Sequence, residues 1–153
     1  MRAPGNEQGQ RSAQASVAAE LFVDTSAWYP LAQRQHPDHT RLATALRERI
    51  AAGTRVVTTN LVLAETHALM LSRIGQGIAL AFLRQVRAPP NDVVYSTEEL
   101  ERRAEASWLE RYDDQTFSMT DALSFEVMVD RRIREALTLD HHFAVAGFTV
   151  VPR

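Results

Sequence analysis

Short apolar runs alternate along this chain with longer amphipathic segments, and this alternation restricts the folds that it can adopt. The apolar runs that we predict as strands cover residues 21–23, 55–58, 93–95, 136–139 and 148–151. Apolar residues at helical spacing predict helices over residues 26–33, 40–52, 61–74, 78–86, 97–112 and 120–132. Strands that alternate with helices in this order predict the α/β class, with a parallel sheet that helices cover on both faces.

Length and composition favour a single globular domain. The chain has 153 residues, of which 45% are hydrophobic and 24% charged. We expect residues 21–153 to form the domain. Residues 1–20, rich in Ala, Gln, Ser and Gly, are expected to be a disordered tail or the result of a start codon placed too early. No apolar stretch reaches the ~20 residues that a membrane span needs.

The types of residue that are missing exclude several classes of function. The absence of cysteine excludes disulfides, thiolate catalysis and cysteine-ligated zinc, and it fits a cytoplasmic protein. All 17 basic residues are arginine. Without lysine, the chain cannot be a P-loop nucleotide hydrolase, nor a phosphotransfer enzyme or receiver domain that depends on a catalytic lysine. The net charge of −2 gives no global attraction to nucleic acid, so RNA binding would require a local patch or a metal ion.

Two of the predicted strands end on an aspartate. Asp24 follows residues 21–23, and Asp140 directly follows the strand predicted over residues 136–139. Each has an ordinary alternative role: Asp24 as the N-cap of the next helix, and Asp140 as a turn residue. Because parallel strands bring their carboxyl ends to one edge of the sheet, where such folds bind ligands, we expect both carboxylates at that edge.

Two more acids fall on predicted helices. Glu65 follows the apolar run 61–64, so we expect it to be partly buried and to need a partner, although a solvated position is the alternative. Asp121 is the fourth residue of Ser118-x-x-Asp121, which matches a capping box; on local grounds the cap is favoured. Carboxylates gathered at one edge would repel one another unless a cation neutralised them. An oxygen-only set selects Mg2+ or Mn2+, and zinc is disfavoured because no HExxH helix occurs.

Four segments together resemble the motifs of PIN-domain ribonucleases, particularly VapC-type toxins of bacterial toxin-antitoxin pairs. They are LFVDTSAW, TTNLVLAET, FSMTDALSFEVM and ALTLDHHFAVAGF, in the order and at the spacing of that family. The resemblance implies a three-layer α/β/α sandwich with a central parallel sheet. It also implies that the acids corresponding to Asp24, Glu65, Asp121 and Asp140 line an Mg2+ or Mn2+ site and are the catalytic residues.

The same resemblance implies an activity and partners. We expect a metal-dependent endoribonuclease that hydrolyses RNA phosphodiester bonds, the toxin of a type II toxin-antitoxin system, blocked by a cognate antitoxin protein. A homodimer is also expected, for which residues 61–71 and 78–86 offer apolar surface, unless these belong to the core. The alternative is a non-catalytic RNA-binding or scaffold module that keeps the fold.

Other polar and aromatic residues have two possible roles. Four that flank the acids could position water or phosphate, with capping or turn roles favoured: Thr25, Ser26, Asn60 and Thr138. Two histidines could touch RNA or shuttle protons, with a surface or packing role favoured: His141 and His142. Arginines that could contact phosphates, with a solvated helix face favoured, are Arg102, Arg103, Arg131, Arg132 and Arg134. Core positions are favoured over base stacking for Trp28 and Trp108.

Overall fold

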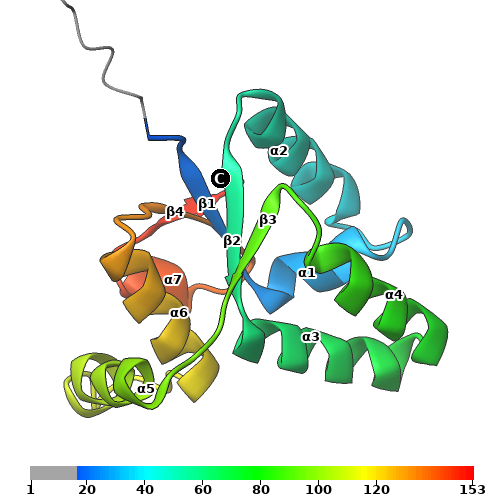
Figure 1. The fold of residues 1–153 in the computed structure, drawn as a ribbon. Helices are drawn as coiled ribbons and strands as arrows, with labels where there is room; N and C mark the ends of the chain where they lie inside the picture. Colours follow the sequence, from blue (N-terminus) through cyan, green and yellow to red (C-terminus); the bar gives the residue numbers. More distant parts are fainter. Residues whose placement is uncertain (1–16) are drawn as a thin grey trace, which may run out of the picture.

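The structure is a computed structural model, and it describes residues 17–153 (Figure 1). Most of the predicted tail, residues 1–20, lies outside this range, so its disorder stays a prediction. The first strand already includes Glu20, one residue before the predicted start of the domain.

A five-stranded sheet forms the centre of the domain, with the strand order β3-β2-β1-β4-β5. Its strands are β1 (Glu20–Val23), β2 (Arg55–Thr59), β3 (Asn91–Val94), β4 (Glu135–Leu137) and β5 (Thr149–Val151). All neighbouring strands pair in parallel, as predicted. Leu21, Phe22 and Val23 are fully buried in succession, because helices cover both faces of this central strand.

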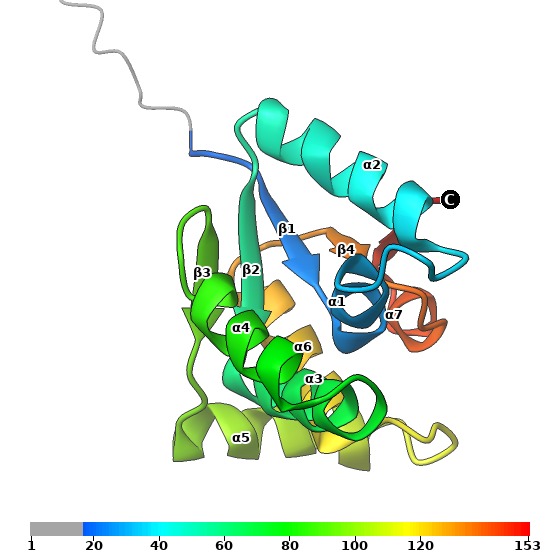
Figure 2. The ribbon, with the colours of Figure 1, turned by 90° about the vertical axis from the view of Figure 1, so that its right-hand side faces the viewer.

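Helices cover the sheet in two layers. The helices are α1 (Thr25–Leu31), α2 (His39–Ala51), α3 (Asn60–Arg73), α4 (Gln76–Val86), α5 (Glu98–Ala104), α6 (Met119–Asp130) and α7 (His142–Val145). Figure 1 shows α1 to α4 on one side of the sheet and α5 to α7 on the other. The turned view of Figure 2 looks onto the first layer, with α4 and α3 in front of the strands. The predicted three-layer α/β/α sandwich is confirmed.

Several local features differ from the sequence-based predictions. The strand predicted over residues 136–139 is Glu135–Leu137, so two residues separate it from Asp140. The helix predicted over residues 97–112 divides into α5 and a π-helix, Glu105–Glu110. The residues after Asp140, predicted as a turn, form the short helix α7. Asn60 was expected to cap α3, but the cap is Thr59, whose hydroxyl accepts the N–H of Val62 at 3.2 Å. The carboxamide of Asn60 instead accepts the N–H of Ser96.

An aromatic cluster packs α6 against α7 and the π-helix. Phe125 lies 5.0 Å from Phe143 and 5.1 Å from both Trp108 and Phe117, measured between ring centroids, each pair edge to face. Trp108 is 8% exposed, and so is Trp28 on the opposite layer. Both tryptophans therefore belong to the core, the role that the sequence favoured.

Most of the arginines that were candidates for phosphate binding are engaged in ion pairs. Arg103 binds both carboxylate oxygens of Asp130, at 2.8 and 2.9 Å, and contacts Glu126. Arg131 joins α6 to the strands β1 and β3 through Glu20 and Asp92. These contacts favour a structural role for this group of arginines.

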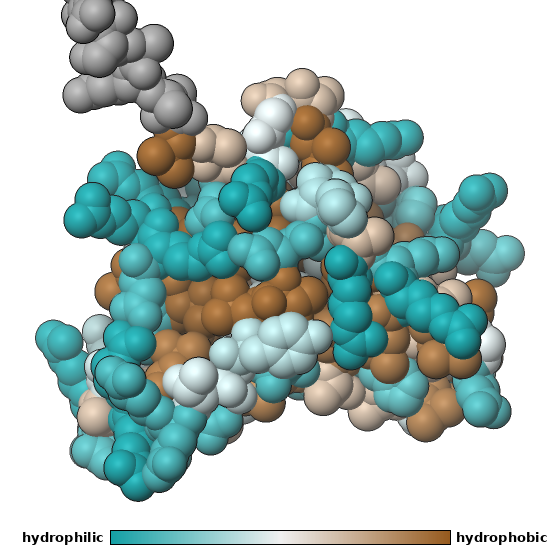
Figure 3. Space-filling model, in the orientation of Figure 1, coloured by the Kyte–Doolittle hydropathy of each residue, from teal (hydrophilic) through white to brown (hydrophobic). Residues whose placement is uncertain are grey.

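One face of the molecule exposes an apolar centre that hydrophilic residues surround. On the face shown in Figure 3, apolar residues are visible at the centre, where β2 and β3 lie in Figure 1, and hydrophilic residues surround them. β3 is an edge strand, and Val93 and Val94 are only partly buried. Within residues 17–153, no helix has the length and apolar character needed to cross a bilayer.

Candidate active site

The site lies where the order of the strands reverses. The chain runs outward from β1 to β2 and β3, and then returns to the other side of β1 as β4. A crevice at the carboxyl ends of the strands is expected at such a switch point. Asp24 directly follows β1, and Thr138, Leu139 and Asp140 follow β4.

Asp24 is held from two sides through a single carboxylate oxygen. As N-cap of α1, its Oδ2 accepts the backbone N–H of Ser26 at 3.3 Å and the Ser26 hydroxyl at 2.9 Å. The hydroxyl of Thr138, which follows β4, donates to the same oxygen at 3.2 Å. The predicted cap is therefore real, and it orients the carboxylate rather than excluding a second role.

The environment of Asp24 opposes its charge. The side chain is 5% exposed, and burial raises the pKa of its carboxyl from 3.8 to about 6. Hydrogen bonds from Ser26 and Thr25 lower this pKa, and the nearby charge of Asp121 raises it further. Asp24 and Asp121 therefore lie close enough to interact electrostatically, and a cation between them would stabilise both in their ionised forms.

Asp121 combines a structural and a positional role. Its Oδ2 accepts the N–H of Ser118 at 3.0 Å, while the Ser118 hydroxyl accepts the N–H of Asp121 at 3.0 Å. This reciprocal pair is the predicted capping box of α6. The same Oδ2 lies 3.2 Å from Nδ1 of His142 in the first turn of α7.

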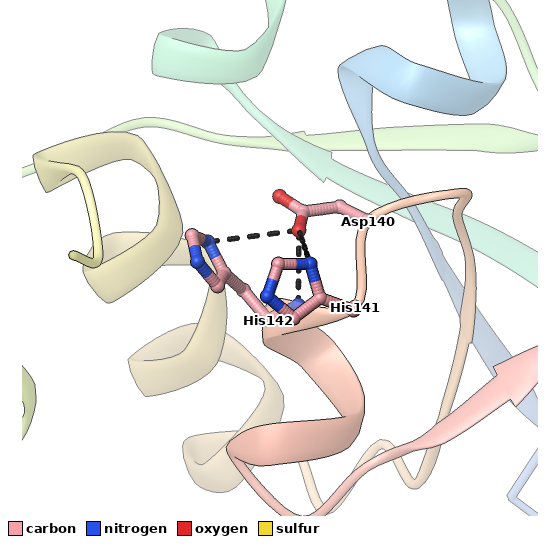
Figure 4. A group of neighbouring side chains, drawn as sticks. All are labelled: Asp140, His141 and His142. Carbon is pink, nitrogen blue, oxygen red and sulfur yellow. Dashed lines mark hydrogen bonds and ion pairs between the residues drawn. The ribbon is translucent and has the colours of Figure 1, made fainter. Parts of the chain in front are cut away.

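Asp140 belongs to a cluster with the two histidines that follow it. Figure 4 shows the carboxylate of Asp140 facing both imidazole rings at the start of α7. Its Oδ1 accepts the backbone N–H of His142 at 2.9 Å and lies 3.6 Å from Nδ1 of that ring and 3.7 Å from Nδ1 of His141. The N–H of Asp140 in turn donates to Thr138 at 2.9 Å. Asp24, Asp121 and Asp140 are thus joined through Thr138 and His142.

Glu65 is placed differently from the expectation. It is exposed rather than partly buried, because the residues that α3 buries are Val62, Leu63, Thr66 and Met70. Within residues 17–153, no hydrogen bond or ion pair joins Glu65 to the three aspartates. Its neighbour Thr66 donates to Thr25 at 3.0 Å, which anchors this part of α3 beside the start of α1.

The four flanking polar residues separate into two pairs. The hydroxyls of Ser26 and Thr138 contact Asp24 and lie 3.0 Å apart. The hydroxyl of Thr25 instead bonds to α3, and Asn60 bonds to Ser96 after β3. Ser26 and Thr138 therefore hold the carboxylates in place, and the structural alternative is favoured for the other two.

Asp24 and Asp121 flank a group of possible metal donors rather than belonging to it. Among the described residues, that group is Asp140, His141 and His142, with one donor atom from each within 4.8 Å of the others. Within the described residues, Oδ1 of Asp121 and Oδ2 of Asp140 receive no hydrogen bond, although the other oxygen of each carboxylate does. These free oxygens still reach solvent, because the only fully buried, unpaired side-chain polar atom described is Nε1 of Trp28. Buried or crowded carboxylates with unused oxygens are suited to Mg2+ or Mn2+.

Sequence reasoning gave His142 too little weight. The surface or packing role expected for the two histidines agrees with His141, whose side chain is 81% exposed, and with His142, whose side chain is 16% exposed; the contacts of His142 with two acids were not anticipated. Its ring packs edge to face on Phe117, with centroids 5.3 Å apart. The one signal in the sequence was its place two residues after Asp140; the contact with Asp121 depends on the tertiary structure.

Comparison with known proteins shows the family of this chain. The family model described as PIN domain matches residues 21–148. The chain belongs to the PIN-domain family. This match covers the whole described sheet except for Glu20 and the last strand.

Curated relatives of this PIN domain carry VapC names. The 23S rRNA-specific endonuclease VapC20 of Mycobacterium tuberculosis is 36% identical over 131 residues, which cover 86% of this chain and 97% of the relative. Ribonuclease VapC26 of the same organism is 30% identical over 141 residues, which cover 86% of this chain and all of the relative.

Solved structures show the same fold. The crystal structure of M. tuberculosis VapC20, described as a sarcin-ricin loop cleaving toxin, superposes with a TM-score of 0.73 at 34% identity, covering 84% of this chain and 96% of that one. VapBC2 from Rickettsia felis, bound to a DNA fragment from its promoter, gives a TM-score of 0.63 at 13% identity and covers 86% and 96% of the two chains. The second likeness concerns the fold alone.

Proposed function

We propose that this PIN domain is a metal-dependent endoribonuclease and the toxin of a toxin-antitoxin pair. The observation that carries the proposal is the chain of contacts at the switch point of the sheet, in which Thr138 links Asp24 to Asp140 and His142 links Asp140 to Asp121. The VapC names of relatives up to 36% identical support the same activity.

The three aspartates would hold an Mg2+ or Mn2+ ion, with Glu65 acting through a water molecule. When bound, such an ion makes a coordinated water more acidic and offsets the charge that builds on the phosphate and the leaving oxygen. Glu65 suits the indirect role because it is exposed on α3, outside the linked group of acids. Its carboxylate would accept a proton from the attacking water or orient that water.

The protein residues around Asp24 prepare the site for this chemistry. Ser26 and Thr138 fix Oδ2 of Asp24, so the carboxylate does not have to reorganise when substrate arrives. The burial that raises the pKa of Asp24 to about 6 also strengthens its attraction for a cation over that of an exposed carboxylate. At neutral pH the ionised form still predominates.

The substrate that we propose is ribosomal RNA of the large subunit. The relative that is 36% identical over nearly its full length is named for 23S rRNA. Next to Asp140 lies a hollow of about 280 Å³, open to solvent, whose lining includes Arg41, Thr138 and His141. It offers one cation and one exposed ring beside the acids, which suits a nucleotide flanking the scissile phosphate.

An antitoxin and a second copy of the chain are the protein partners that we propose. A second hollow, of about 350 Å³, lies between α1 and α4 and is lined by Trp28, Phe82 and Ile78. Ile78 is 46% exposed. An antitoxin segment with apolar side chains would fit this hollow. Leu71 and Leu80, 48% and 40% exposed, add apolar area for a homodimer.

The activity is tested with purified protein free of any inhibitor. Intact ribosomes and total RNA are incubated with Mg2+ or Mn2+, and new RNA ends are mapped by sequencing. We expect cleavage at a few positions of large-subunit RNA, lost in Asp24→Asn and kept in Asp113→Asn, a matched change at an exposed turn. RNA binding without cleavage would instead support the non-catalytic alternative.

A further inference from the structure

We propose that His142 is a nitrogen ligand of the metal site and makes it prefer Mn2+ and other first-row transition ions over Mg2+. This inference depends on the proposed function in that it concerns the same site. It departs from the all-oxygen site that the four acids alone suggest, because an imidazole changes which ion is favoured.

The first argument is the separation of the donor atoms. Nδ1 of His142 lies 3.2 Å from Oδ2 of Asp121 and 3.6 Å from Oδ1 of Asp140. Two ligands bonded to one ion at about 2.1 Å, at the angles of octahedral or tetrahedral coordination, are roughly 3.0 to 3.4 Å apart. The separation from Asp121 falls within this range, and that from Asp140 lies slightly above it.

The second argument is what holds the ring there. A charge-assisted hydrogen bond from an imidazole to a carboxylate is about 2.7 to 2.9 Å long. The hydrogen bond of Nδ1 with Asp121 is 3.2 Å long and Asp140 lies 3.6 Å away, so no short ion pair fixes the ring. The ring is also placed by its own backbone N–H, which donates to Asp140 at 2.9 Å, and by edge-to-face packing on Phe117.

The third argument is the contrast with His141. One donor atom from each of Asp140, His141 and His142 lies within 4.8 Å of the others, so proximity alone does not separate the two rings (Figure 4). The side chain of His141, however, is 81% exposed, and the one described acid that it approaches is Asp140, at 3.7 Å. That of His142 is 16% exposed and faces two of the acids. His141 is therefore the matched control.

The choice of ion follows from ligand chemistry. Mg2+ prefers oxygen ligands and keeps several of its waters, whereas imidazole binds first-row transition ions better. Removing His142 should therefore weaken Mn2+ binding at least about tenfold, in the range seen when groups around a metal are removed. Mg2+ binding should change little, and the selectivity ratio is the quantity to compare.

The test measures ion binding directly on the full chain. Free Mn2+ is titrated by electron paramagnetic resonance, and Mg2+ is measured by competition, for wild type, His142→Ala, His142→Gln and His141→Ala. Pulsed spectra of bound Mn2+ should show coupling to an imidazole nitrogen in wild type and His141→Ala. Both His142 variants should lack it and should lose the Mn2+ preference.

His142→Gln separates ligation from mere positioning, because its amide keeps a hydrogen-bond donor near Asp121 without an imidazole nitrogen. A Gln variant with wild-type selectivity would overturn the inference, and so would equal losses of both ions in His142→Ala. Mn2+ binding that depends on Asp24 but shows no nitrogen coupling overturns the role of His142 and leaves the proposed function standing. If wild type binds neither ion, both the role of His142 and the proposed metal-dependent function are contradicted.

Discussion

The hydroxyl of Thr138 donates a 3.2 Å hydrogen bond to Asp24, although 114 residues separate the two in the sequence. The same hydroxyl accepts the N–H of Asp140 at 2.9 Å, and Thr138 is 1% exposed. One buried side chain thus connects the acid after β1 with the acid after β4, and it sets the distance between them.

Thr138→Val should damage both stability and cleavage. Valine keeps the shape but leaves the partly buried N–H of Asp140 and the buried Oδ2 of Asp24 with one partner fewer, which costs about 1 to 3 kcal/mol. Urea unfolding and RNA cleavage measure the two effects, and Thr138→Ser, which keeps the hydroxyl, should lie close to wild type. A fully active and stable valine variant would show that the bridge is dispensable.

Asp24→Asn should abolish cleavage and make the metal-free protein more stable at pH 7.5. Ionised Asp24 is buried and repelled by Asp121, and a rise in pKa from 3.8 to about 6 corresponds to about 3 kcal/mol. Asparagine removes the charge and remains a good N-cap for α1. We expect a gain of about 1 to 3 kcal/mol in the free energy of unfolding. A loss of stability would contradict the conclusion that the ionised carboxylate of Asp24 destabilises the metal-free fold.

The pH dependence of this gain has a definite sign. Because the pKa of Asp24 is higher in the folded than in the unfolded state, the folded chain binds more protons between about pH 4 and 6. Wild-type stability relative to Asp24→Asn therefore falls as pH rises through this window. The difference should be near zero below pH 4 and complete above about pH 6. Denaturation of both proteins at a series of pH values, without divalent ions, measures it.

Mn2+ should offset the destabilisation caused by ionised Asp24, and it should do so in wild type but not in Asp24→Asn. An ion that binds only the folded protein adds about 2.7 kcal/mol at a concentration one hundred times its dissociation constant. The melting temperature of wild type at pH 7.5 should rise with Mn2+, and that of Asp24→Asn should not. Equal shifts in the two proteins would place the ion elsewhere.

The apolar pattern of the sequence was sufficient for the architecture but not for the orientation of every acid. The run Leu21–Val23 must be buried on both faces, so the central parallel strand and the two helical layers follow from local pattern. The buried face of α3 was harder to predict, because the four residues before Glu65 are all apolar and leave no polar side to the helix. The helix buries Thr66 instead, and Glu65 faces outward.

Contacts between segments that are distant in the sequence could not be predicted from local sequence patterns. Thr59 and Asn60 are both good capping residues in adjacent positions, and only the contact of Asn60 with Ser96 decides between them. The approach of His142 to Asp121 likewise depends on how α7 packs against α6. Individual acids could therefore be proposed from the sequence, whereas the hydrogen bonds that join them could not.

Glu65→Gln should reduce cleavage without changing stability. The side chain is exposed, so the free energy of unfolding should change by less than about 0.5 kcal/mol. If Glu65 orients or deprotonates the attacking water, the rate of cleavage should fall by about 100-fold or more, while RNA binding remains. Glu99→Gln, at an exposed position of α5, is the matched control. Unchanged cleavage in Glu65→Gln would remove this residue from the site.

Glu126→Ala should destabilise the fold while leaving the chemistry intact. Glu126 is 7% exposed and accepts hydrogen bonds from Nε1 of Trp108 at 3.0 Å and from Arg103 at 3.2 Å. Truncation leaves a buried indole N–H and a guanidinium without this partner, at a cost of about 2 to 4 kcal/mol. Glu126→Gln, which keeps an acceptor for Trp108, should cost less. Cleavage per folded molecule, measured well below the melting temperature, should match wild type, because the described contacts of Glu126 run to the π-helix and α5 rather than to the three aspartates.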